Sequence, residues 1–152
     1  MFLENTKKCL KIFEKVYVSS DSQLILDQAR AIGAIPIWRP QKLCGDVPNV
    51  PVYRHAMDKM GEADIVAVQA NSPTLNPDLI LWVKGMMEMG ANEVMTCYPN
   101  YEIYGSIWAM TYKRLMEYTD FYHPKPDTLI VDPSVDIHTW DDYEEALKWT
   151  QQ

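Results

Sequence analysis

Two side chains near the end of the sequence have the types and spacing of metal ligands. Asp136 and His138 lie two residues apart in a stretch that has the pattern of extended backbone. Residues i and i+2 of such a stretch point to the same side, so the two side chains could meet one ion. Magnesium favours oxygen ligands and often needs only one or two carboxylates plus substrate phosphates, which makes Asp136 the stronger ligand. The alternative is structural, with Asp136 in a turn and His138 preceding a helix cap at Thr139.

Other polar residues with binding chemistry follow the predicted strands. Arg39 has a planar guanidinium that donates several fixed hydrogen bonds to a phosphate or a base carbonyl. Gln69 both donates and accepts, and Ser72 adds a hydroxyl contact, which suits a ligand with many hydroxyl groups. Asn71 between them could serve the ligand or its own loop. The structural alternatives are a surface arginine before a proline for Arg39 and a loop-closing amide for Gln69.

Strand and helix patterns alternate along the chain, which predicts an α/β domain: a mostly parallel, Rossmann-like sheet with helices on both faces. The predicted strands are 16–19, 35–38, 65–69, 94–97, 106–110 and 129–131, and the predicted helices are 22–32, 52–60, 77 to before 90, 113–118 and one after Thr139. Residues 65–69 are the most apolar run and therefore the expected central strand. Pro36 predicts an edge position or a short strand for 35–38. Ligands in such folds bind beyond the carboxyl ends of strands, where the polar residues above lie.

Composition narrows the class of protein. A chain of 152 residues with 47% hydrophobic residues predicts one domain over 1–152 with a real core. The sequence has no signal-peptide pattern and no run of some 18 apolar residues, so we expect no membrane insertion. Three separated cysteines without a C-x-x-C pair favour the reducing cytoplasm. The net charge of -7, without a basic run, argues against nucleic-acid binding.

Six short motifs, in order, resemble the acylneuraminate cytidylyltransferases, the family that makes CMP-sialic acid and its relatives. The strand end Val-Ser-Ser-Asp at 18–21 is similar to the family's V-S-T-D, and Gly33-Ala34 follows the helix after it as in the family. The other motifs are R-P-x-x-L-x-x-D at 39–46, Gln-Ala-Asn-Ser-Pro at 69–73, Tyr-Gly-Ser-Ile-Trp at 104–108 and Asp-Ile-His-Thr-x-x-Asp at 136–142. The resemblance therefore covers the chain from residue 16 onward.

The resemblance implies a nucleotide-diphospho-sugar transferase fold and transfer of CMP from CTP to an acidic sugar, with release of pyrophosphate. It assigns Ser19 and Arg39 to the nucleotide and residues Gln69, Asn71 and Ser72 to the sugar. It assigns Asp136 the catalytic role of holding Mg²⁺, with His138 as a second ligand. A homo-oligomer is compatible with this family.

Three departures from the family pattern leave the activity open. The family begins with a strand and a Gly-rich, Arg/Lys-bearing loop that cradles the triphosphate, and this sequence starts after it, so we expect an N-terminally incomplete domain with weak CTP binding. The family also has an insertion that helps to form the sugar pocket and the dimer arm, and here only Tyr98–Tyr104 stands in its place. The family has an aspartate at the position of His138, and this difference predicts a weak magnesium site. The alternatives are a non-catalytic binding or assembly module with the same fold, and a transferase for an eight-carbon ulosonic acid.

Overall fold

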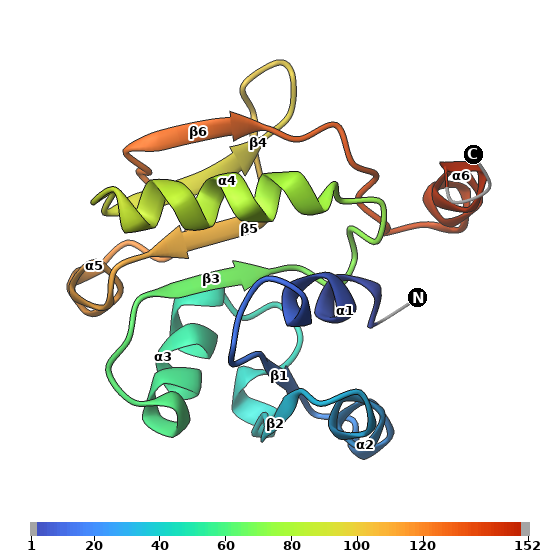
Figure 1. Cartoon of the computed structure of the whole chain (residues 1–152), viewed down its shortest axis with the longest axis horizontal. Coiled ribbons are helices and arrows are strands. Elements are labelled where there is room, and N and C mark those ends of the chain that lie inside the picture. Colours follow the sequence, from blue (N-terminus) through green and yellow to red (C-terminus); the bar gives the residue numbers. More distant parts are fainter. Residues whose placement is uncertain (1–2, 150–152) are drawn as a thin grey trace.

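The computed structural model describes residues 3–149, which fold into alternating helices and strands (Figure 1). In chain order these are α1 (Glu4–Leu10), β1 (Tyr17–Ser20), α2 (Gln23–Ala31), β2 (Ile35–Trp38), a 3₁₀ turn (Gln41–Leu43), α3 (Asn49–Met60), β3 (Ile65–Val68), α4 (Pro77–Glu88), β4 (Glu93–Cys97), β5 (Ile103–Met110), α5 (Tyr112–Glu117), β6 (Thr128–Val131) and α6 (Trp140–Trp149). The α/β class predicted from the sequence is confirmed.

The strands form two sheets. β1 and β2 pair in parallel, and a four-stranded sheet has the order β3-β5-β4-β6. β4 and β6 are parallel, whereas β5 runs antiparallel to both of its neighbours. The short link from β4 to β5 explains this direction, because parallel strands need a crossover of a dozen or more residues. Tyr98 N closes that link on Glu102 O at 2.8 Å.

Helices cover both faces of the four-stranded sheet, as predicted. Ile107 and Ala109 of β5 point to a core shared with α1 and α4. Trp108 and Met110, which alternate with them, point to a second core under α3 and α5. In Figure 1, α4 lies in front of the strands β4 and β5. α3 lies below β3, and α5 lies at the left of the view.

The ends of the helices show which sequence signals were sufficient to predict a helix boundary. Ser22 caps α2 with a 3.5 Å bond from Ile25 N, and the side chain of Asn76 accepts from Asp78 N at the start of α4. Both helices start within one residue of the predicted position. α3 begins at Asn49, three residues earlier than predicted. α1 was not predicted, because its buried residues, Asn5 and Cys9, form no apolar stripe.

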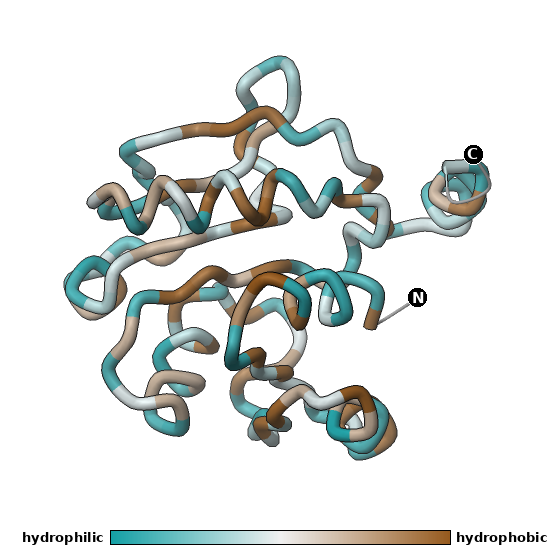
Figure 2. Tube along the Cα trace, viewed as in Figure 1, coloured by the Kyte–Doolittle hydropathy of each residue, from teal (hydrophilic) through white to brown (hydrophobic). Residues whose placement is uncertain are grey.

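The predicted central position of residues 65–69 is wrong. β3 lies at one edge of the four-stranded sheet, and Val66, Ala67 and Val68 are only partly buried although the run is hydrophobic throughout (Figure 2). The edge position predicted for β2 from Pro36 is confirmed, because β2 pairs with β1 alone within residues 3–149.

Candidate functional site

The loop after β3 and the segment after β6 meet directly. Asn71 Nδ2 donates a hydrogen bond to Asp136 Oδ1, and Ile137 N donates to Asn71 O at 2.9 Å. Val135 N donates to Thr74 Oγ1 at 2.8 Å. In Figure 1 the arrowheads of β3 and β6 point to the same side of the molecule, which explains how loops some 60 residues apart come together. The two loops that the sequence singled out therefore lie together, as expected from their places after strands.

Asp136 and His138 lie on the same side of their segment, as their spacing predicted, and contact each other. His138 Nε2 lies 2.7 Å from Asp136 Oδ2, and the Asp136 side chain is 15% exposed against 69% for His138. Both carboxylate oxygens of Asp136 thus have partners, namely Asn71 and His138. Residues 3–149 contain no group of three His, Cys, Asp or Glu side chains placed to hold a metal ion. This donor set fits a divalent ion only when bound phosphates supply most of the ligands.

Ser72 lies beneath the loop and not at its surface. Its side chain is fully buried, and its hydroxyl contacts the Tyr104 hydroxyl. Burial raises the pKa of Tyr104 to about 12, so this phenol keeps its proton at neutral pH. Gly105, inside β5, has a φ of +72°, which favours glycine, and a Cβ atom there would lie 2.8 Å from Met95 Cε. The sequence analysis gave Tyr104 no role, yet its hydroxyl lies directly against Ser72.

A buried polar cluster ties the ends of β4, β5 and β6 together behind this loop. Asp132 is completely buried and accepts hydrogen bonds from Ser134 N at 2.9 Å, Ser134 Oγ at 2.6 Å and Ser106 Oγ. Thr96 Oγ1 lies 2.8 Å from Ser106 Oγ. The contacts of Asp132 hold the start of the segment that leads to Asp136. A polar Asp132 directly after an apolar strand was the only signal of the cluster in the sequence.

The two residues assigned to the nucleotide touch each other. Arg39, directly after β2, donates from Nε to Ser19 Oγ at 3.1 Å and from Nη2 to Ser19 O at 2.8 Å. These bonds use two of the five N–H donors of a guanidinium, and they fix its plane. Arg39 and Ser19 both line a cavity of about 430 Å³ between β1 and β3.

Gln69 faces this cavity and not Asp136. Its Nε2 donates to Tyr53 Oη of α3 at 3.1 Å, and its carbonyl accepts from Asn5 Nδ2 of α1 at 2.7 Å. Burial raises the pKa of Tyr53 above its usual range. The structure therefore separates the predicted residues into two adjoining groups. Ser19, Arg39 and Gln69 line the cavity, while Asn71, Ser72, Asp136 and His138 surround the loop junction.

The start of α6 has the predicted capping box and a pH dependence that can be measured. Asp142 Oδ2 accepts hydrogen bonds from His138 N at 3.0 Å and Thr139 N at 2.8 Å, and these bonds hold the pKa of Asp142 below its ordinary 3.8. A lowered pKa means that the carboxylate stabilises the folded helix start above the ordinary value. This contribution is lost as the pH falls through the folded-state pKa.

We therefore expect the amide resonance of Thr139 to titrate in acid with a midpoint below 3.8. NMR spectra recorded from pH 6 to about pH 2 measure this midpoint. Asp142→Asn, which cannot titrate, is the control and should remove the transition. A midpoint at or above 3.8 in the unmodified chain would contradict the capping geometry.

Comparison with known proteins supports the fold. No protein-family model matches the sequence, and no curated protein matches it. One similar solved structure is CMP:2-keto-3-deoxy-manno-octonic acid synthetase complexed with CTP, with a TM-score of 0.71 and 14% identity over 99% of this chain and 88% of that chain. Another is Rv0371C in complex with manganese from Mycobacterium tuberculosis H37Rv, with a TM-score of 0.65 and 14% identity over 97% of this chain and 86% of that chain.

The helices of residues 3–149 are all too short or too polar to span a bilayer. The arrangement of strands and helices, together with these structural neighbours, shows that this chain has the nucleotide-diphospho-sugar transferase fold.

Proposed function

We propose that this chain is a cytidylyltransferase-like protein that binds CTP and an acidic sugar at the carboxyl edge of its sheets. The observation that carries the proposal is the contact between Asn71 and Asp136, which joins the loops after β3 and β6 beside the cavity that holds Arg39. The structural neighbour with bound CTP supports the nucleotide. The order of the six sequence motifs supports the same class of reaction.

The residues have distinct parts in this proposal. Arg39, fixed by Ser19, donates to the base or the phosphates, and Gln69 faces the sugar from the cavity wall. Asn71 donates to a sugar hydroxyl, and the buried Ser72 positions Tyr104 beneath the loop. A sugar hydroxyl attacks the α-phosphate of CTP, forming a P–O bond while pyrophosphate leaves. Such transfers depend on positioning and charge neutralisation.

Asp136 would hold the divalent ion, and that ion would neutralise phosphate charge when bound. The manganese in the second structural neighbour supports a divalent ion at a fold of this type. We propose Mg²⁺, because oxygen ligands and phosphates suit it. His138 and Asn71 already contact the two carboxylate oxygens of Asp136, so an ion would compete with these contacts, which predicts a weak site.

The substrate class is an acidic sugar in either of two forms. The strand at 104–108 and the closing segment at 136–142 favour a sialic-acid-like sugar by resemblance. The name of the CTP-bound neighbour favours an eight-carbon acid. A non-catalytic module with the same fold is the alternative in a different class, and it predicts no turnover with either sugar.

Calorimetric titration with CTP and magnesium tests the nucleotide part of the proposal. We expect the chain to bind CTP with a Kd on the order of 1 mM, and Arg39→Ala to weaken binding about tenfold or more, since one charged contact is worth roughly 1.4 kcal/mol. Arg30→Ala is the matched control, because Arg30 forms an exposed ion pair with Asp27 on α2. Equal affinities for the chain and both variants would remove Arg39 from the site.

A further inference from the structure

A lysine of α1 is bonded to the loop that follows β3. Lys8 Nζ donates hydrogen bonds to Pro73 O at 2.6 Å, to Leu75 O at 2.8 Å and to Asn5 Oδ1 at 3.0 Å. An ammonium group has three N–H donors, whereas a neutral amine has two, so these three partners require the charged form of Lys8. The charge of Lys8 therefore lies among three neutral oxygen atoms.

The surroundings of Lys8 differ from those of a surface lysine. Its side chain is only partly exposed, and burial lowers the pKa of its ammonium group below the ordinary 10.5. Glu4, Cys9 and Asp132 act in the opposite direction. Lys7, the next residue, is an exposed lysine that forms an ion pair with Glu4 at 2.8 Å. Lys8 has instead exchanged water for loop carbonyls, and their hydrogen bonds offset the cost of its burial.

Asn5, three residues earlier on α1, bonds the same loop. Its Nδ2 donates to Gln69 O at 2.7 Å and to Ser72 O at 2.8 Å, and its residue is only 4% exposed. Together, the side chains of Asn5 and Lys8 bond four of the seven carbonyls of residues 69–75. Figure 1 shows α1 beside the end of β3, where this loop begins. We call Asn5 and Lys8 the α1 clasp.

The loop that the α1 clasp holds is the one that contacts the segment after β6. Asn71 and Thr74 make these contacts. Asn71 Nδ2 donates to Asp136, Ile137 N donates to Asn71 O at 2.9 Å, and Val135 N donates to Thr74 Oγ1 at 2.8 Å. A movement of the loop would therefore also move or release Asp136.

We propose that Asn5 and Lys8 are positioning residues for Asp136, which act on it through residues 69–75. The loop carbonyls need donors at this depth, and a charged donor makes stronger hydrogen bonds than a neutral one. Lys8 is the member of the α1 clasp that supplies this charge. The inference rests on the proposed function only for what Asp136 does, because the position of Asp136 can be measured without CTP.

Amide hydrogen exchange at Ile137 of the full chain measures this positioning in the absence of any ligand. Lys8→Met keeps an unbranched apolar stem and removes the ammonium group, so it should speed exchange at Ile137 at least about tenfold. Lys7→Met is the matched control. It removes the same charge from an exposed position on the same helix and should leave this rate unchanged. The amide of Ala109 in the central strand β5 reports unfolding of the whole domain and should change much less than Ile137.

A chemical rescue separates the donors of Lys8 from the packing of its stem. Lys8→Ala removes the side chain beyond Cβ, and n-propylammonium matches the missing part in length, charge and N–H donors. We expect this ion to return the exchange rate of Ile137 in Lys8→Ala toward that of the unmodified chain. Tetramethylammonium at the same concentration has the same charge without an N–H donor, and it should not. Equal rates with the two ions would contradict the role of the donors.

Titration of magnesium at fixed CTP concentration then tests the link to the proposed function. Lys8→Met should weaken magnesium binding at least about tenfold, in the same direction as Asp136→Ala, and Lys7→Met should not. Faster exchange at Ile137 with unchanged magnesium affinity would support the α1 clasp and contradict the ion site at Asp136.

Two results would overturn the α1 clasp whatever CTP does. The first is equal exchange at Ile137 in the unmodified chain, Lys7→Met and Lys8→Met. The second is equal acceleration at Ile137 and Ala109 in Lys8→Met, which would show that Lys8 stabilises the whole domain and does not position Asp136.

Discussion

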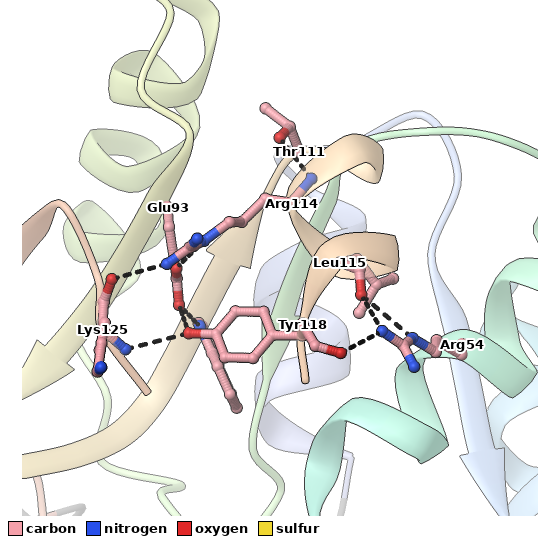
Figure 3. A network of polar contacts seen from close by, with 8 residues as sticks. Arg54, Glu93, Thr111, Arg114, Leu115, Tyr118 and Lys125 are labelled. Carbon is pink, nitrogen blue, oxygen red and sulfur yellow. Dashed lines mark hydrogen bonds and ion pairs between the residues drawn. The ribbon is translucent and has the colours of Figure 1, made fainter. Parts of the chain in front are cut away.

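Glu93→Ala is expected to lower the free energy of unfolding by about 3–5 kcal/mol, the largest stability effect in this chain. The Glu93 side chain is completely buried and accepts from Trp108 Nε1 at 2.8 Å, Arg114 Nε at 2.7 Å and the Tyr118 hydroxyl (Figure 3). Alanine would leave these donors without their acceptor. The loss would loosen the junction of β4, β5 and α5.

Urea unfolding followed by circular dichroism measures this effect. Glu88→Ala is the matched control, because Glu88 forms an exposed pair with Lys84 and its loss should change stability by about 0.5 kcal/mol or less. Glu93→Gln keeps one acceptor and should be intermediate. A loss of less than about 1 kcal/mol for Glu93→Ala would contradict the importance of this network.

The second large effect is expected at Asp136. Asp136→Ala should remove the magnesium dependence of CTP binding, because it deletes the carboxylate of the proposed ion site. His138→Asp should act in the opposite direction. It replaces an imidazole that contacts Asp136 Oδ2 with a second carboxylate, which should tighten magnesium binding about tenfold in the presence of CTP.

Titration of magnesium at fixed CTP concentration, with each variant checked for folding, measures both changes. Asp141→Ala serves as the control, because this exposed carboxylate lies in the first turn of α6 and outside the contacts of Asp136. Equal magnesium affinity in the unmodified chain and in Asp136→Ala and His138→Asp would exclude the ion site. The proposed CTP contact of Arg39 would stand after such a result, because it does not depend on the ion.

The elements that the sequence predicted are those with strong local signals. α4 has a capping asparagine at Asn76, a proline at its first position and a regular apolar stripe, and it forms as expected. The apolar run of β3 predicted a strand, but local pattern does not specify which strands pair, so its edge position was missed. α1 was missed because it buries a polar residue, Asn5, that bonds loop carbonyls 64 and 67 residues away.

The site was predictable only in part for similar reasons. Asn71 and Asp136 both follow strands, so the rule that loops gather at the carboxyl edge placed them together. Tyr104 and Asp132 were not identified, because their partners Ser72 and Ser106 lie far from them in the sequence. Such contacts form only when the chain folds, and the neighbouring residues in the sequence do not reveal them.

The most direct test of the central claim is an NMR titration of the ¹⁵N-labelled chain with CTP and magnesium. The proposed function predicts shifts in the amides of Ser19, Arg39, Gln69, Asn71 and Asp136, and none in the outer edge of β6. Adding an acidic sugar should shift Asn71 further. Shifts absent at about 10 mM CTP, well above the expected Kd, or confined to residues outside this set, would contradict the assignment of a CTP site to this edge of the fold.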